Sequence, residues 1–127
     1  MFQFFISRAN SFRYAISGWW YVIKTQKNAW LHAIATMLVY GISLWLNLSP
    51  RDFAVLTLTI GLVWTSEIIN TALEAVVDLA SPHQHPLAKV GKDVGAAAVL
   101  ISSLVAVVIG ILLLGPPIYE RIVSLFP

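Results

Sequence analysis

Four polar side chains in one otherwise apolar segment are spaced so that they could do chemistry together. They are Glu67, Asn70, Glu74 and Asp78. Each residue of an α-helix advances by about 100°, so these side chains fall at roughly 0°, 300°, 340° and 20° and share one narrow stripe. A carboxylate at the middle of a membrane helix costs roughly 2.5–3.5 kcal/mol, so three acids on one face need partners or a task.

Three interpretations of this stripe stay open from the residues alone. The acids could pair with Lys89, Lys92 or Arg13 and hold helices together, or they could conduct ions or protons. A magnesium site has the better chemical motive, because Mg²⁺ takes oxygen ligands and usually combines one or two carboxylates with substrate phosphates.

Lys92 and Asp93 begin the next apolar run, and Lys89 lies three residues earlier on the same helical side. Alone, Lys92 is typical of a lysine that buries its stem and keeps its ammonium in water. Beside three carboxylates and a loop, a phosphate-binding lysine is the stronger interpretation. The small residues Gly95–Ala98 that follow would let helices approach closely.

The elements that must position these residues are membrane helices. Of 127 residues, 58% are hydrophobic and 11% are charged, whereas soluble domains are about a quarter charged. This composition excludes a soluble enzyme and a disordered chain. A net charge of +2 with eight basic residues argues against nucleic-acid binding. The absence of cysteine excludes disulfides, thiol catalysis and Cys-ligated zinc.

The sequence predicts an all-α membrane protein of one domain, residues 1–127, with an N-terminal amphipathic surface helix over about residues 1–27. Three transmembrane helices are predicted over about 29–48, 53–80 and 94–114, because runs of about twenty apolar residues cross a bilayer. Ser49-Pro50 is a helix-start signal, Ser81-Pro82 ends the second span, and Gly115-Pro116-Pro117 is predicted to stop the third. Charges interrupt the N-terminal region, which argues against a signal peptide.

Basic residues predict the orientation in a cell membrane. The N-terminal region and the loop between the second and third spans hold six of the eight, and only Arg51 and Arg121 lie on the other side. Since cytoplasmic loops carry the Lys/Arg excess, the N-terminus and the second loop are predicted to be cytoplasmic. Trp19, Trp20 and Trp30 are predicted to be interface anchors, and His32 is interpreted as an interfacial or helix-contact residue.

Two segments resemble signatures of the prokaryotic diacylglycerol kinase family. They are EIINTALEAVVD, residues 67–78, and KDVGAAAVL, residues 92–100, and the resemblance extends from about Arg8 to Gly110. It implies a homotrimeric membrane kinase with a surface helix and three spans, in a family that includes undecaprenol kinases. The implied reaction is transfer of the γ-phosphate of MgATP to a lipid alcohol.

The resemblance also implies roles for single residues. Glu67 matches the general base, and Glu74 matches a metal ligand that faces ATP. The other residues implied to line the nucleotide or active-site face are Arg8, Arg13, Tyr14, Asn70, Asp78, His83, Gln84, His85, Lys92 and Asp93. Of the two arginines, either is a candidate for the one near the phosphates. His83-x-His85 could bind metal, but with no cysteine and no third ligand a nucleotide-contacting loop is favoured.

Gln26 departs from the family pattern, which usually has a second metal-binding glutamate at this position. Glutamine offers a neutral carbonyl oxygen, a weaker ligand for Mg²⁺ than a carboxylate. The predicted function is therefore an ATP- and Mg²⁺-dependent kinase acting on diacylglycerol, with undecaprenol as the alternative acceptor. A rival from another class is a non-catalytic ion or proton channel subunit that uses the acidic stripe.

Overall fold

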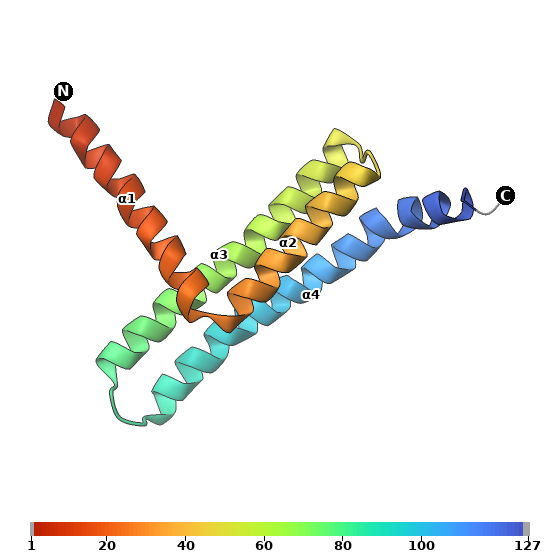
Figure 1. Cartoon of the computed structure of the whole chain (residues 1–127). Helices are drawn as coiled ribbons and strands as arrows, with labels where there is room; N and C mark the ends of the chain where they lie inside the picture. Colours follow the sequence, from red (N-terminus) through yellow and green to blue (C-terminus); the bar gives the residue numbers. More distant parts are fainter. Residues whose placement is uncertain (1, 126–127) are drawn as a thin grey trace.

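A computed structural model describes residues 2–125, with the side chains of residue 8 and residues 10–125. Four helices follow one another: α1 (Phe2–Thr25), α2 (Lys27–Trp45), α3 (Pro50–Ala80) and α4 (Pro86–Val123). No strand occurs among the described residues, so the all-α prediction is confirmed. Figure 1 shows α3 and α4 running antiparallel, with α2 beside them and α1 leaving the bundle at a steep angle.

Local signals explain where the helices begin and end. Gln26 has extended backbone (φ −98°, ψ 118°) and separates α1 from α2. The hydroxyl of Ser49 accepts a hydrogen bond from the backbone N–H of Asp52 at 3.2 Å. With Pro50 directly after this cap, α3 starts as expected for a Ser-Pro signal. His85 caps α4, because its Nδ1 accepts from the backbone N–H of Leu87 at 3.2 Å.

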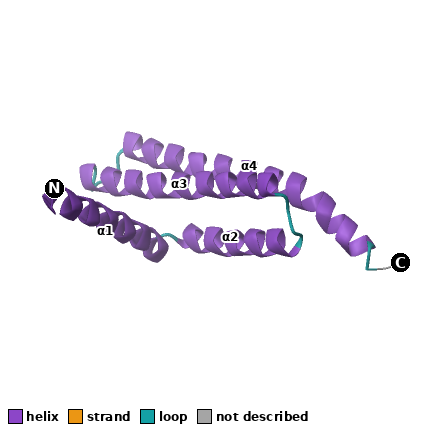
Figure 2. Cartoon of the chain, turned by 90° about the horizontal axis from the view of Figure 1, so that it is seen from above, coloured by secondary structure: helices purple, strands orange, loops and turns teal. Residues whose placement is uncertain are grey.

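The predicted stop at Gly115-Pro116-Pro117 is wrong, because α4 continues through both prolines to Val123. Proline removes a backbone hydrogen bond and crowds the preceding turn, yet its fixed φ is close to the helical value. A helix can therefore bend there and resume. Figures 1 and 2 show the last part of α4 turning away from α3. Beyond the bend, the Arg121 guanidinium lies 5.9 Å from the centre of the Trp45 ring at the end of α2.

Two described helices, α3 and α4, are long and apolar enough to cross a membrane by length and composition. The most apolar windows of α3 and α4 are only 28% and 17% buried inside the chain. The 19-residue helix α2 is not in this group, and its first turns carry the polar residues Lys27, Asn28 and His32. The hydropathy of α2 alone therefore does not support the transmembrane helix predicted over residues 29–48.

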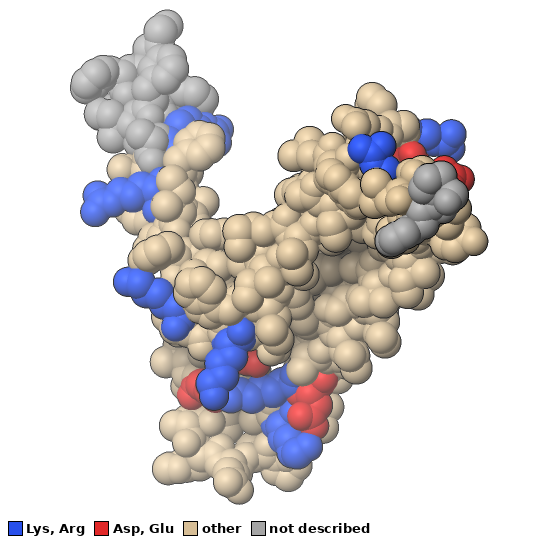
Figure 3. Space-filling view, turned by 45° about the vertical axis from the view of Figure 1, so that its right-hand side comes forward, with Lys and Arg blue, Asp and Glu red and all other residues tan. Residues whose placement is uncertain are grey.

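The chain exposes far more surface than a self-sufficient globule. Its accessible surface is 9693 Å², whereas a folded soluble monomer of 14.0 kDa would expose about 6,700 Å². The interior is correspondingly small and centres on Val22, Ala29 and Trp64 where α1, α2 and α3 meet. In Figure 3 one group of charged side chains lies at the upper right and others lie along the left side and in the lower middle, with an uncharged band between them. This surface needs lipid or partner chains to cover it.

Candidate active site

Helix α3 carries the acidic stripe from the interior of the bundle toward the α3–α4 loop. Glu67 is 1% exposed and Asn70 is 7% exposed, although both are polar. Glu74 is half-buried, and Asp78, one turn nearer the loop, is exposed. The α3 helix thus holds Glu67 deep in the bundle, Glu74 at an intermediate depth and Asp78 at the exposed end near the α3–α4 loop.

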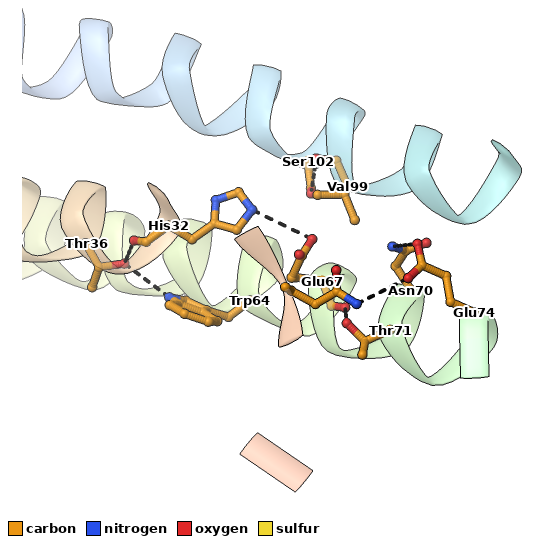
Figure 4. Close-up of polar contacts among 10 residues, drawn as sticks. His32, Thr36, Trp64, Glu67, Asn70, Thr71, Glu74, Val99 and Ser102 are labelled. Carbon is orange, nitrogen blue, oxygen red and sulfur yellow. Dashed lines mark hydrogen bonds and ion pairs between the residues drawn. The ribbon is translucent and has the colours of Figure 1, made fainter. Parts of the chain in front are cut away.

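Glu67 has an unusual environment for a buried acid. Its Oε2 has no hydrogen-bond partner among the described residues. Nε2 of His32 on α2 lies 3.8 Å from this oxygen (Figure 4). This distance exceeds the usual hydrogen-bond range, so both atoms stay buried and unpaired. A buried polar atom without a partner costs about 1–3 kcal/mol.

Glu74 is held by two amide groups. The Gln26 side chain reaches from the α1–α2 junction and donates from Nε2 to Oε2 of Glu74 at 3.2 Å. Asn70 donates from Nδ2 to the other oxygen at 3.1 Å. Two donors on one carboxylate leave the oxygen of the Asn70 amide, Oδ1, buried and without a partner in the part of the chain described.

Gly95 on α4 makes room for this arrangement. A Cβ at this position would lie 2.4 Å from Oδ1 of Asn70 and 3.1 Å from a methyl carbon of Leu73. Real side chains do not tolerate such an approach, so only glycine lets α4 pack this closely against Asn70. The small residue therefore positions the amide that donates to Glu74.

A second polar cluster lies near the α3–α4 loop. Lys92 forms a close ion pair with Asp78, and Lys89 pairs with Asp93 at 2.6 Å between Nζ and Oδ2. All four lie beside an open hollow of about 810 Å³ whose wall also includes His83, Gln84 and His85. This places the predicted loop residues and the predicted phosphate-binding pair around one cavity.

The two loop histidines lie in exposed positions beside the hollow. His85 caps α4 with Nδ1, and both histidines are exposed. In residues 2–125 no group of three His, Cys, Asp or Glu side chains is placed to hold a metal ion.

The predicted residues of α1 lie away from the buried stripe. Tyr14 is 72% exposed, and Arg8 and Arg13 are exposed on the same helix. The helix touches α3 farther along, where the Trp19 and Trp64 ring centres are 4.5 Å apart. The structure thus brings Gln26, but not these three side chains, to the stripe. Trp19, predicted to be an interface anchor, is also a contact between helices.

Sequence reasoning missed His32 and Gly95 as parts of this site. The sequence favours an interfacial or helix-contact role for His32, because its position beside Glu67 depends on the register of α2 against α3. The signal available was a single histidine within an apolar run. For Gly95 the signal is a glycine two residues after Asp93, at the start of a run of small residues, which indicates only close helix approach.

Comparison with known proteins adds independent information. Residues 13–114 match the family described as prokaryotic diacylglycerol kinase. A diacylglycerol kinase of Synechocystis is 43% identical over 114 residues, which cover 89% of this chain and 65% of that protein. An undecaprenol kinase of Bacillus subtilis is 36% identical over 106 residues, covering 84% of this chain and 86% of that protein.

A diacylglycerol kinase of Escherichia coli is 36% identical over 101 residues, covering 74% of this chain and 83% of that protein. The chain thus spans somewhat less than two thirds of the Synechocystis relative and more than four fifths of the other two. These matches support a lipid kinase. The family match covers most of the chain, and the chain belongs to the prokaryotic diacylglycerol kinase family.

Proposed function

We propose that this chain is an ATP-dependent lipid kinase that transfers the γ-phosphate of MgATP to diacylglycerol and forms phosphatidic acid. The observation that carries the proposal is the pair of carboxylates on one face of α3. Glu67 is buried and unpaired, and Glu74, about two turns away, is half-buried and held by amides. Phosphoryl transfer needs a positioned nucleophile and compensation of the phosphate charge, and these two acids suit those two tasks.

Glu67 is proposed as the general base. It takes the proton of the acceptor hydroxyl while the hydroxyl oxygen bonds to the γ-phosphorus. The bond from that phosphorus to the bridging oxygen breaks, and its electron pair leaves with ADP. The unpaired Oε2 supports this role, since no hydrogen bond in the described chain competes for it.

The donor atoms around Glu74 fit magnesium. The group comprises the Glu74 carboxylate and the amides of Asn70 and Gln26, which face it through their nitrogens. The Asn70 oxygen is buried without a partner in the described chain. Mg²⁺ is commonly held by one or two carboxylates together with substrate phosphates. Glu74 and Gln26 are the proposed ligands, with Gln26 turning its amide oxygen toward the ion. Bound there, magnesium would neutralise negative charge on the phosphates.

The hollow near the α3–α4 loop is proposed to receive the nucleotide. Its wall carries Asp78, Lys92 and Asp93 with the loop residues His83, Gln84 and His85. Lys92 would exchange its exposed partner Asp78 for a phosphate group. Tyr14 and one of Arg8 and Arg13 would complete the nucleotide site from α1, which requires the bound nucleotide to extend toward that helix.

An apolar groove supports a lipid as the acceptor. The groove has a volume of about 420 Å³, lies between α2, α3 and α4, and is lined by His32 and Trp64 together with aliphatic side chains. Because His32 also contacts Glu67, a chain lying in this groove would bring its hydroxyl end to the base. The Bacillus subtilis relative, named an undecaprenol kinase, makes undecaprenol the second candidate acceptor.

The proposed assembly is a homotrimer in the cell membrane. Each chain would cross the membrane three times, through α2, α3 and α4. The exposed apolar faces of α3 and α4 support burial in lipid or against other copies. The distribution of basic residues supports a cytoplasmic location for the N-terminus and the α3–α4 loop. A cysteine replacing His83 should then react with an impermeant thiol label only from the cytoplasmic side. A cysteine replacing Arg51 should react only from outside, and the reverse pattern would overturn the orientation.

The activity is tested with purified protein in lipid vesicles supplied with labelled ATP and either diacylglycerol or undecaprenol. We expect transfer of the label to diacylglycerol, and Glu67→Gln should lower the rate by at least 100-fold. Glu120→Gln removes an exposed acid at the far end of α4 and should keep the wild-type rate. Transfer only to undecaprenol would correct the acceptor, and no transfer to either lipid would refute the kinase assignment.

A further inference from the structure

His32 faces the proposed base Glu67, and the proposed transfer of the γ-phosphate does not use its side chain. Its Nε2 lies 3.8 Å from Oε2 of Glu67. Both atoms are buried without hydrogen-bond partners among the described residues, and Figure 4 shows them pointing toward each other. A contact between helices alone would not require two polar atoms to be buried unpaired.

Neighbouring side chains hold the imidazole in this direction. The Trp64 ring meets it edge-on, with 6.0 Å between ring centres. The Trp64 indole donates to the hydroxyl of Thr36 at 3.1 Å, and that hydroxyl donates to the backbone carbonyl of His32 at 2.7 Å. Trp19 from α1 packs on the other side of Trp64. Residues of three helices therefore fix the ring beside Glu67.

Few other titratable groups face Glu67. On its own helix, Glu74 acts on it through space. On α4 the side chains at this level are Val99 and Ser102, and the Ser102 hydroxyl donates to the Val99 carbonyl at 2.9 Å (Figure 4).

The charged groups elsewhere on these helices are engaged away from Glu67. On α4, Lys89, Lys92 and Asp93 form ion pairs near the loop. On α1, Lys24 lies over the Trp20 ring. Within the described chain, His32 is thus the one basic group placed against Glu67.

We propose that His32 is the proton partner of Glu67, a positioning residue whose Nε2 receives the proton that Glu67 takes from the acceptor hydroxyl. The inference rests on the proposed kinase function. The proton moves from the hydroxyl to Glu67 and then to His32, which regenerates the carboxylate and leaves an imidazolium. Transfer requires the two atoms to approach from 3.8 Å to about 3 Å. His32 is 16% exposed against 1% for Glu67, so it can release the proton more readily.

His32→Gln tests this role, because glutamine keeps a polar side chain of similar reach but cannot take up a proton. We expect kcat for lipid phosphorylation to fall about 100-fold, with the acceptor KM changing by less than about threefold. Tyr40→Phe is the matched control on α2. It removes a hydroxyl that donates to Thr57 and should leave both quantities unchanged.

His32→Ala with added imidazole provides a second test that is independent of the glutamine variant. His32 lines the apolar groove, so its removal opens space that free imidazole can enter. Imidazole should restore activity to His32→Ala and have no effect on the wild type. A wild-type kcat in His32→Gln, or no rescue of correctly assembled His32→Ala, would overturn the proposal. An inactive wild type would instead refute the kinase function on which it rests.

Discussion

Two polar clusters lie on the same pair of helices and differ in how their charges are satisfied. Near the α3–α4 loop, Asp78 pairs with Lys92 and Asp93 pairs with Lys89, and these side chains are largely exposed. In the interior, Glu67 and His32 face one another beyond hydrogen-bond distance. Exposed ion pairs contribute about 0–1 kcal/mol each, whereas each buried unpaired atom costs about 1–3 kcal/mol.

This difference suits the two clusters to different tasks. The interior cluster suits a reaction with a bound substrate, and the exposed cluster suits an exchange of ion-pair partners. The buried atoms gain hydrogen bonds only when another molecule arrives, so their unfavourable state is relieved by substrate. The exposed pairs are already satisfied, and a phosphate group could replace a carboxylate at little cost. Substitutions in the interior cluster should therefore lower the kinase activity strongly. Substitutions in the exposed cluster should change the free energy of unfolding very little.

The largest effect is expected at Glu74, whose carboxylate is shared by two amide donors. Glu74→Gln should abolish lipid phosphorylation, because it removes the anionic oxygen proposed to bind magnesium. Membrane insertion and the assembly state should be unchanged, as measured by membrane extraction and size-exclusion chromatography. A variant with full activity would remove Glu74 from the proposed metal site.

Gly95→Ala should have the next largest effect, because the new methyl group would overlap the Asn70 amide. We expect a loss of about 1–3 kcal/mol in the free energy of unfolding, as for an overpacked interior, together with a lower kinase rate. Denaturation in detergent micelles measures the first and the lipid assay the second. Gly61→Ala on α3 is the control, because nothing lies within 4 Å of its added Cβ. Equal behaviour of the two variants would show that Gly95 does not position Asn70.

Asp78→Asn should change the free energy of unfolding by less than about 1 kcal/mol, because its ion pair with Lys92 is exposed. Raising the salt concentration should shrink even that difference, since salt screens exposed charges. The measurement is the same denaturation experiment at low and high ionic strength. A loss of several kcal/mol would mean that the loop cluster is structural, and the comparison between the two clusters would fail.

Gln26→Glu should have the smallest effect. This substitution adds a negative charge beside Glu74. A second carboxylate beside Glu74 offers Mg²⁺ another anionic oxygen, so half-maximal activity should occur at a lower magnesium concentration. Because ATP itself brings magnesium, we expect a shift of a few-fold, measured by titrating Mg²⁺ at fixed ATP. Unchanged magnesium dependence or lower activity would show that Gln26 serves Glu74 as a hydrogen-bond donor and not as a degraded ligand.

Features that depend on neighbours along the chain could be predicted from the amino-acid sequence. Helical periodicity placed Glu67, Asn70 and Glu74 on one face of α3, and the Ser49-Pro50 signal located the start of that helix. Composition indicated a chain that exposes apolar surface. The motifs at residues 67–78 and 92–100 indicated the family that the comparisons then showed. All of these follow from spacing within one segment.

The side chains that meet across helices could not be predicted in this way, because their contacts depend on how the helices pack. The register of α2 against α3 puts His32 beside Glu67, and the close approach of α4 makes Gly95 necessary for Asn70. The extended backbone at Gln26 turns its amide toward Glu74. Whether Pro116 and Pro117 end α4 or bend it also depends on contacts beyond the prolines, such as Arg121 on Trp45. Helix spacing fixes directions within one helix, but the sliding and rotation of helices against each other are set by packing along their whole length.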